Sequence, residues 1–410
     1  MVVLGMVILT SLAFDFTNGF HDTANAMATS IATGALKPKM AVALSAVLNL
    51  IGAFLSVQVA LTVTNSVIRI QDSTGAPDPR LTANGGSALL LIVLAGLVGA
   101  IIWNLLTWLL GLPSSSSHAL FGGLIGATIA GLGFSAVKWV GTGTKLDGVV
   151  GKVILPALLS PLIASVVAMT GTWLIYRLTK KVAEKFRNDG FRWGQIGSAS
   201  LISLAHGMND AQKTMGIITL ALIASGQWHD LHAVPLWVKG ACATAIALGT
   251  FIGGWRIIRT LGKGLVEIDS PQGLAADSAS AATIIVSSHL GFALSTTHVA
   301  TGSIIGTGLG RKGAQVRWAV ALRMLVAWLI TLPSAGLVAA LTWAVGHFIG
   351  GLAGAIVIFA ILVGCAGYMF WHSRKNPVGH HNVTDDWDAR AEEVLPIEAE
   401  QIEAEKEVVR

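Results

Sequence analysis

The sequence predicts an all-α polytopic membrane protein, with about 11–12 transmembrane helices in two inverted-topology repeats and broken or re-entrant helices at a polar site. Charged residues make up 12% of the 410 residues and hydrophobic residues 53%, whereas a soluble domain carries about 25% charged residues. The mean hydropathy is +0.69, and runs such as 87–112 and 345–371 exceed the roughly 20 apolar residues that cross a bilayer. Polar motifs that recur along the chain are the third observation.

The apolar spans are expected to be helices, because a helix satisfies its own backbone hydrogen bonds inside a bilayer. In chain order they lie near 2–36 (interrupted), 40–64, 87–112, 114–136, 149–176, 196–224, 234–255, 273–292, 295–310, 315–343 and 346–371. We divide the chain into a first repeat (1–178), a short basic cytoplasmic loop (179–194), a second repeat (195–345), a terminal transmembrane helix (346–371) and an acidic cytoplasmic tail (372–410).

Basic residues predict the orientation, because lysine and arginine mark cytoplasmic loops. The densest basic loop, 177–192, is placed inside. Counting from this loop places most of the other basic clusters on the same side: Lys37, Lys39, Arg256, Arg259, Lys263, Arg311, Lys312, Arg374 and Lys375. The N-terminus is then outside and the C-terminus cytoplasmic, with Lys138, Lys145 and Lys152 as outer exceptions. Re-entrant hairpins at 13–36 or 273–310 would change the count of spans.

Two pairs of motifs indicate an internal duplication. The segment 18-NGFHDTANAM-27 resembles 206-HGMNDAQKTM-215, at an offset of 188 residues (18 to 206). The segment 111-GLPSSSSHALFGGLIG-126 resembles 291-GFALSTTHVATGSIIG-306, at an offset of 180 residues (111 to 291). An odd number of spans separates the partners, so the halves are inverted, which is typical of secondary transporters. Channels can also be duplicated, so the repeat favours transport without specifying a carrier.

The first motif carries polar residues on one helix face. Asn18, Asp22, Asn25 and Thr29 follow helical spacing, and His206, Asp210 and Lys213 repeat that spacing in the second half. Polar faces of this kind inside a membrane normally point into the bundle or into a wet cavity. The alternative is a structural role in hydrogen bonding between helices.

The serine and threonine motifs predict an anion site. Ser114–Ser117 and Ser295–Thr297 each precede an apolar, glycine-rich helix, and hydroxyls with free backbone N–H groups at a helix start attract anions. Two such sites facing each other suit a tetrahedral oxyanion. The alternative for each cluster is simple N-capping, and His118 and His298 that follow are either packing groups or ligands.

Two aspartates beside an anion require a positive charge. A bound cation or a proton would neutralise the carboxylates, and inward movement of one negative charge costs about 2.3 kcal/mol per 100 mV of inside-negative potential. The residues therefore predict cation-coupled symport of an oxyanion.

At these residues the sequence resembles the PiT family of inorganic phosphate transporters. The family's Gly-x-Asn-Asp-x-x-Asn motif is similar to 19-GFHDTAN-25 and 207-GMNDAQK-213, and its Ser-Thr-Thr-His element to 115-SSSH-118 and 295-STTH-298. The resemblance covers about residues 10–345 and implies transport of phosphate, more rarely sulfate, with sodium or protons. It also implies a homodimer in the cytoplasmic membrane, and a metal–phosphate complex is a possible substrate in the bacterial branch.

The resemblance also implies the roles of individual residues. The implied phosphate ligands are Ser115, Ser116, Ser117, Ser295, Thr296, Thr297, Asp22, Asn25 and Asp210. The implied coupling-cation residues are Asn18, His21, Asp22, Asn209, Asp210 and Lys213. No further cofactor is expected, and a metal ligand set is not assigned.

Two positions depart from the family pattern. His21 stands where the first motif usually has asparagine, as in the bacterial low-affinity branch, and Lys213 stands where the second motif usually ends in asparagine. Lys213 lies one turn from Asp210 and is suited to pair with it. Our hypothesis is that its ammonium takes the place of a sodium ion, so that protons are the coupling ion, with His21 or Asp22 as the carrier. The family's long central hydrophilic loop is also replaced by a short basic loop.

Three rival functions are weighed against phosphate symport. A sulfate symporter would share the architecture, but phosphate is the better match because it can donate a hydrogen bond to Asp22 or Asp210. An ion channel is the rival from another class. A hydrolase using Ser117 and His118 is disfavoured because a nucleophile and its base are usually distant in sequence. We expect no enzyme activity and no nucleic-acid partner, and Asp277 and His289 have no assigned role.

Overall fold

The computed structural model describes residues 1–60, 79–141, 148–182, 184–230 and 233–385. These residues form helices and connecting turns, and the only β pairing among them is an isolated bridge between Val266 and Val316. The predicted all-α class is therefore confirmed. Lys145, part of the basic loop and most of the predicted acidic tail (386–410) lie outside the described residues.

The described part of the first half of the chain forms five helices and two short turns of helix. These are α1 (Val2–Ala32), α2 (Pro38–Gly52), α4 (Pro79–Leu109), α5 (Ser116–Leu132), η1 (Phe134–Ala136), the π-helical turn η2 (Val150–Ile154) and α6 (Leu155–Leu178). The second half comprises α7 (Glu184–Ala224), α8 (Leu236–Ile252), α9 (Trp255–Arg259), η3 (Thr260–Gly264), α10 (Ser270–His289), α11 (Thr296–Gly310), α12 (Trp318–Ile349) and the terminal α13 (Gly351–Ser373).

Five of the described helices are long and apolar enough to cross a membrane: α1, α4, α6 with η2, α12 and α13. A sixth candidate is α8 with α9 and η3, which bend by 60° at Gly253 and Gly254. Other expected spans are shorter, because α2, α5 and α11 have 15, 17 and 15 residues. The chain is a multi-pass membrane protein.

The expected interruption of the first span is wrong. α1 is one continuous helix of 31 residues through the whole polar motif. Its small polar side chains return hydrogen bonds to the helix itself, as when the Thr23 hydroxyl donates to the Gly19 carbonyl at 2.6 Å. Its larger polar side chains, such as Asp22 and Asn25, form hydrogen bonds with other helices. The buried polar groups are therefore satisfied without an interruption of the helix.

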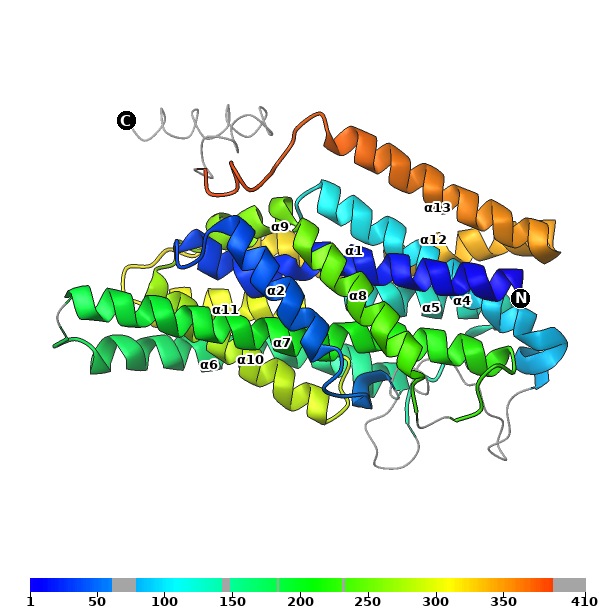
Figure 1. The fold of residues 1–410 in the computed structure, drawn as a ribbon, viewed down its shortest axis with the longest axis horizontal. Helices are drawn as coiled ribbons and strands as arrows, with labels where there is room; N and C mark the ends of the chain where they lie inside the picture. The colour runs from blue at the N-terminus through cyan, green and yellow to red at the C-terminus, as the bar shows by residue number, and fades with distance from the viewer. Residues whose placement is uncertain (61–78, 142–147, 183, 231–232, 386–410) are drawn as a thin grey trace.

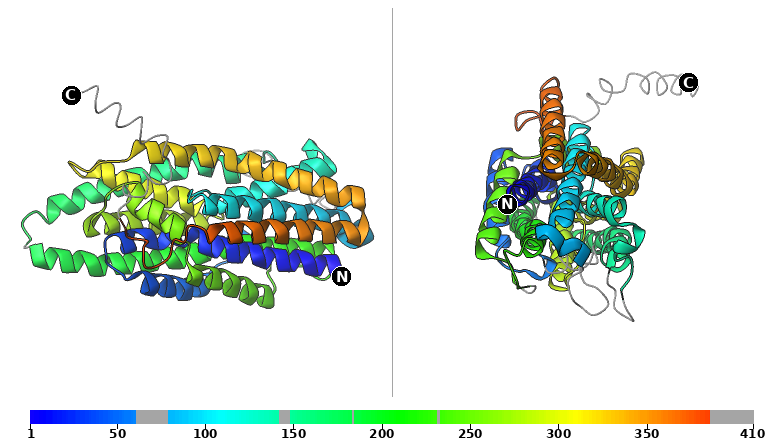
Figure 2. Two further views of the ribbon diagram at one scale, coloured as in Figure 1. Left: turned by 90° about the horizontal axis from the view of Figure 1, so that it is seen from above. Right: turned by 90° about the vertical axis from the view of Figure 1, so that its right-hand side faces the viewer.

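The helices lie roughly along the long axis of the molecule (Figure 1). The N-terminus and the α12–α13 connection lie at one end, and the α6–α7 connection lies at the other end (Figures 1 and 2). α1 therefore runs away from the N-terminal end while α7, which packs against it, runs toward that end. The two helices that carry aspartate are antiparallel neighbours.

The chain reverses at the serine and threonine motifs, where two helical hairpins meet. α4 and α5 form one hairpin and α10 and α11 the other, and each packs on its own partner helix. Their tips are in contact, since the Ser117 hydroxyl donates to the Leu294 carbonyl at 3.4 Å. The rings of His118 and His298 lie 4.8 Å apart, centre to centre. Residues 273–310 thus lie in a helical hairpin, whereas 13–36 do not form one, because most of them belong to the continuous helix α1.

The packing of the helices follows a two-fold correspondence between the halves. α5 packs on α12 as α11 packs on α6, and α1 packs on α8 as α7 packs on α2. Exchanging α1 with α7, α2 with α8, α4 with α10, α5 with α11 and α6 with α12 converts the most extensive contacts among these ten helices into observed contacts. This correspondence supports the predicted division into two inverted repeats.

The motif glycines allow the aspartate-bearing helices to approach their neighbours closely. A Cβ atom on Gly19 would lie 2.3 Å from the carbonyl oxygen of Ile246 in α8. At the matching position, a Cβ atom on Gly207 would lie 2.2 Å from the carbonyl oxygen of Asn49 in α2. Small residues permit such backbone contact between membrane helices, so the two glycines set how deeply α1 and α7 are seated.

Candidate functional site

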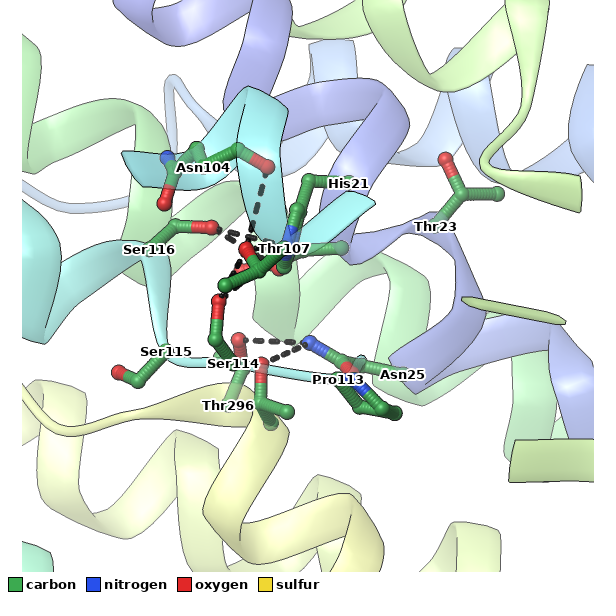
Figure 3. Close-up of polar contacts among 12 residues, drawn as sticks. His21, Thr23, Asn25, Asn104, Thr107, Pro113, Ser114, Ser115, Ser116 and Thr296 are labelled. Carbon is green, nitrogen blue, oxygen red and sulfur yellow. Dashed lines mark hydrogen bonds and ion pairs between the residues drawn. The ribbon is translucent and has the colours of Figure 1, made fainter. Parts of the chain in front are cut away.

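The polar residues of both motif pairs converge where the hairpin tips meet α1 and α7. Figure 3 shows the first half of this region, with His21, Asn25, Ser114, Ser116 and Thr296 directed toward one another. Every predicted site residue is buried: Asn18, His21, Asp22, Asn25, Ser115, Ser116, Ser117, Asn209, Asp210, Lys213, Ser295, Thr296 and Thr297. The structure thus brings together side chains that are up to 272 residues apart in the chain.

Asp22 is held by a histidine and a serine. Its Oδ1 lies 2.7 Å from Nδ1 of His21 and accepts a hydrogen bond from the Ser116 hydroxyl at 3.0 Å. The other ring nitrogen of His21, Nε2, lies 3.2 Å from the hydroxyl of Thr107 in α4 (Figure 3). His21 therefore bridges α1 to the α4–α5 hairpin, and its Nδ1 faces the carboxylate.

Asp210 has two basic neighbours. The Lys213 ammonium contacts Oδ1, and Nε2 of His206 lies 2.8 Å from Oδ2. The hydroxyl of Thr296 also donates to Oδ2 at 2.9 Å. A buried carboxylate with these partners is compensated as an ion pair, which confirms the contact expected between Lys213 and Asp210. The sequence placed His206 on the polar face of its motif without a role in the site, and the structure adds it as a direct neighbour of Asp210.

The hydroxyl contacts obey the same two-fold correspondence as the helices. Ser116 donates to Asp22 and Thr296 donates to Asp210, each within its own repeat. Asn25 donates across the repeats to Thr297 at 3.0 Å. At the position matching Asn25, Lys213 donates across the repeats to Ser117 at 2.6 Å and also reaches the Leu294 carbonyl at 3.0 Å.

Ser115 and Ser295 serve as N-caps of α5 and α11. Each hydroxyl oxygen accepts a hydrogen bond at 3.2 Å from the backbone N–H three residues later, at His118 and His298. This is the capping role that the sequence left open, and it fixes the direction of both helix starts. The positive ends of two helix dipoles then point at the same buried region.

Several oxygen atoms in this region have no hydrogen-bond partner among the described residues. They include the side-chain carbonyls of Asn18, Asn25 and Asn209. Ligand atoms of Asp22, His206 and Asp210 also lie within 4.8 Å of one another. Carboxylate and amide oxygens are ligands that hard cations prefer, so the region has the donor set for a cation as well as hydroxyls for an anion.

Two buried carboxylates outside the predicted set also contact the aspartate-bearing helices. Asp277 in α10 accepts a hydrogen bond at 2.7 Å from Thr29, the last residue of the polar face on α1. Asp15 in α1 accepts one at 2.8 Å from Thr214 in α7. Helical spacing from Asn18 and Asp22 was the available signal for Asp15, since residues 15, 18 and 22 share a face.

Residues 18–339 match the model of the phosphate transporter family. The chain belongs to the phosphate transporter family. The match begins at the first polar motif and ends within α12, so the family features lie in the two repeats and not in α13 or the tail.

Relatives of this phosphate transporter family member carry related descriptions. A probable low-affinity inorganic phosphate transporter of Mycobacterium tuberculosis is 59% identical over 387 residues, covering 94% of this chain and 88% of the relative. A protein of the same description from Bacillus subtilis is 42% identical over 348 residues, covering 84% and 96%. A solved structure described as the sodium-dependent phosphate transporter has a TM-score of 0.70 at 20% identity, over 85% of this chain and 100% of that chain. That likeness establishes the shared fold.

A family of transporters is not an enzyme class, and the geometry of this family member agrees. The Ser117 hydroxyl is engaged by Lys213 and Leu294 in the described contacts. Its neighbour His118 instead packs against His298, whose ring stacks on Trp328 with centres 4.1 Å apart. Ser117 and His118 are therefore not arranged as a nucleophile and its base.

Proposed function

We propose that this chain is a proton-coupled symporter that imports inorganic phosphate across the cytoplasmic membrane. The observation that carries the proposal is the buried ammonium of Lys213, which contacts Asp210, Ser117 and the Leu294 carbonyl where the two hairpin tips meet. Family membership and the descriptions of the relatives support phosphate as the substrate.

The substrate site consists of the hydroxyls and helix starts of the two hairpin tips. Ser116, Ser117, Thr296 and Thr297 already exchange hydrogen bonds with α1 or α7, so a bound anion would replace some of these contacts. Ser115 and Ser295 contribute mainly by orienting the helix starts. Asp22 and Asp210 accept hydrogen bonds there, which favours a partly protonated phosphate over sulfate, since sulfate has no proton to donate near neutral pH.

Proton coupling is favoured by how the charges are compensated. Lys213 supplies one permanent positive charge beside Asp210, where the family pattern has a neutral asparagine. A cation that would otherwise neutralise Asp210 is therefore less needed. His21 contacts Asp22 at 2.7 Å, and histidine changes its charge near physiological pH, so this pair suits a proton that moves with the anion.

The test is uptake of labelled phosphate by purified protein in liposomes. In sodium-free medium, an inside-alkaline gradient of one pH unit should support about tenfold accumulation for each proton moved with the anion. Adding sodium at constant pH should change the rate little. Strict dependence on sodium would contradict proton coupling, and gradient-insensitive flux that does not saturate would indicate a channel.

The same vesicles distinguish the substrates. Excess sulfate should compete weakly with labelled phosphate, whereas strong competition would favour a sulfate symporter of the same architecture. Magnesium should be varied separately, because Asp22, His206 and Asp210 form a cluster that can hold a divalent ion accompanying phosphate. Uptake that requires magnesium would identify a metal–phosphate complex as the substrate.

The orientation follows from the basic loops. We propose that the end carrying the α6–α7 connection is cytoplasmic, with the N-terminus outside and the C-terminus inside. A homodimer is proposed from the family resemblance alone.

A further inference from the structure

Asp15 is a fully buried carboxyl group outside the polar site just described. It lies on α1 with an exposed fraction of 0%. Its Oδ1 accepts the hydrogen bond from Thr214, while Oδ2 has no hydrogen-bond partner among the described residues. No ion pair within the described chain includes Asp15. A buried carboxyl group of this kind is tolerated when a cation pairs with it or when it carries a proton.

The neighbours of Asp15 connect it to the site. Asp210 and Lys213 of α7 act on it electrostatically, and Cys242 of α8 lies beside it. α4 packs against α1 as well. Thr214, the direct partner of Asp15, follows Lys213 in the chain. The hydrogen-bond partner of Asp15 is therefore the residue next in the chain to Lys213, the lysine that pairs with Asp210.

Asp15 has no counterpart in the second repeat. The offset between the motifs places Ser203 at the matching position of α7. The Ser203 hydroxyl donates to the Ala199 carbonyl of its own helix at 2.9 Å. The duplicated architecture therefore folds with a small residue at this position, and packing alone does not call for a carboxyl group in α1.

We propose that Asp15 is a coupling residue that binds the transported proton between the N-terminal end and the phosphate site. This inference rests on the proposed proton symport. A proton from the outer solution binds Oδ2, forming one O–H bond, and the same bond breaks when the proton is released to the inner side. Ionised Asp15 adds a negative charge that repels Asp210 and attracts Lys213. Protonation of Asp15 therefore leaves Lys213 with Asp210 and the hydroxyls that bind the anion.

The experiment compares exchange with accumulation in proteoliposomes. Exchange of labelled for unlabelled phosphate at equal pH requires binding and reorientation but no net proton movement. For Asp15→Asn we expect exchange to continue within about twofold of wild type, while accumulation driven by one pH unit falls about tenfold, to the level of the bath. Ser203→Ala, at the matching position, is the control and should keep both activities.

Infrared difference spectra provide a second measurement on the same protein. A protonated carboxyl group should give a C=O stretching band that changes on addition of inorganic phosphate and is absent in Asp15→Asn. Asp15→Glu should shift the band, which assigns it even where the asparagine variant does not fold.

The outcomes separate this inference from the proposed function. Accumulation by Asp15→Asn equal to wild type would overturn the role of Asp15 while leaving proton symport intact. Equal loss of exchange and accumulation in a folded variant would assign Asp15 to substrate binding and would also overturn it. A wild-type protein that ignores the pH gradient and follows sodium would overturn proton symport and the coupling role together.

Discussion

Lys213 and Asn25 occupy matching positions in the two repeats, and both donate a hydrogen bond to a hydroxyl of the opposite hairpin. They differ in charge, because Lys213 is a cation that forms an ion pair with Asp210. The Lys213 ammonium is covalently attached to the chain and cannot dissociate from the site, whereas a bound cation can. The lysine therefore supplies a fixed compensation of charge that the first repeat lacks.

Replacing Lys213 with asparagine should return the second motif to the family pattern and create a need for a bound cation. For Lys213→Asn we expect phosphate uptake to become stimulated by sodium, with a loss of at least about tenfold in its absence, because removing one partner of a buried ion pair costs about 3–5 kcal/mol and 1.4 kcal/mol is tenfold. Uptake measured over a series of sodium concentrations at fixed pH tests this. Lys39→Asn, an exposed lysine at the start of α2, is the control, and equal sodium-independence of both variants would contradict the prediction.

At the residue scale, much of the site was predictable from spacing. Asn18, Asp22 and Asn25 follow helical spacing in α1 and are buried, as are all residues of α1 from Thr17 to Ile31, and the contact of Lys213 with Asp210 follows from three-residue spacing in a helix. The contact of Asn25 with Thr297 was not predictable, because it joins residues 272 positions apart. Asp277 stands out in the sequence as a charged residue within an apolar span, but its contact with Thr29 could not be predicted, because the two residues are 248 positions apart.

At the scale of elements, the hairpins depend on glycines that let helices touch. A Cβ atom on Gly126 of α5 would lie 2.0 Å from the carbonyl oxygen of Gly336 in α12. At the matching position in the other repeat, a Cβ atom on Gly306 of α11 would lie 2.1 Å from the carbonyl oxygen of Ser165 in α6. Each hairpin is thus seated on a long helix by direct backbone contact.

Adding one methyl group at such a contact should separate the helices. Gly126→Ala is expected to destabilise the protein by about 1–3 kcal/mol, the usual cost of overpacking, and to lower the thermal unfolding midpoint in detergent. Gly364→Ala in α13 is the matched control, since nothing lies within 4 Å of the added atom. A midpoint equally unchanged in both variants would show that α5 and α12 are not closely packed.

Sequence patterns predicted which elements exist better than where they break. The polar run of 18–30 suggested an interruption, but α1 continues because Asp22 and Asn25 find partners on α5 and α11. The breaks occur instead at Ser115 and Ser295, where a serine cap starts a new helix. A hydropathy pattern predicts which residues are buried, but it does not distinguish a continuous helix from a helical hairpin, because both bury the same residues.

At the scale of the whole molecule, the ends of the bundle can be assigned to the two sides of the membrane by labelling. Gln227, beyond the end of α7, and Lys375, beyond the end of α13, are both exposed. In a background without Cys242 and Cys365, Gln227→Cys should react with an impermeant maleimide added to intact cells. Lys375→Cys should react only after permeabilisation, and the reverse pattern would invert the proposed topology.

The crosswise contacts at the hairpin tips have a consequence for the resting state of the empty transporter. Moving the α4–α5 hairpin away from α7 breaks a charge-assisted hydrogen bond from Lys213, whereas moving the α10–α11 hairpin away from α1 breaks neutral bonds from Asn25. Charge-assisted bonds are about twice as strong as neutral ones. Because Asn25 makes two such neutral bonds and Lys213 makes one charge-assisted bond to the hairpin, the two separations cost a similar amount, and we expect the unloaded protein to release either hairpin with comparable ease.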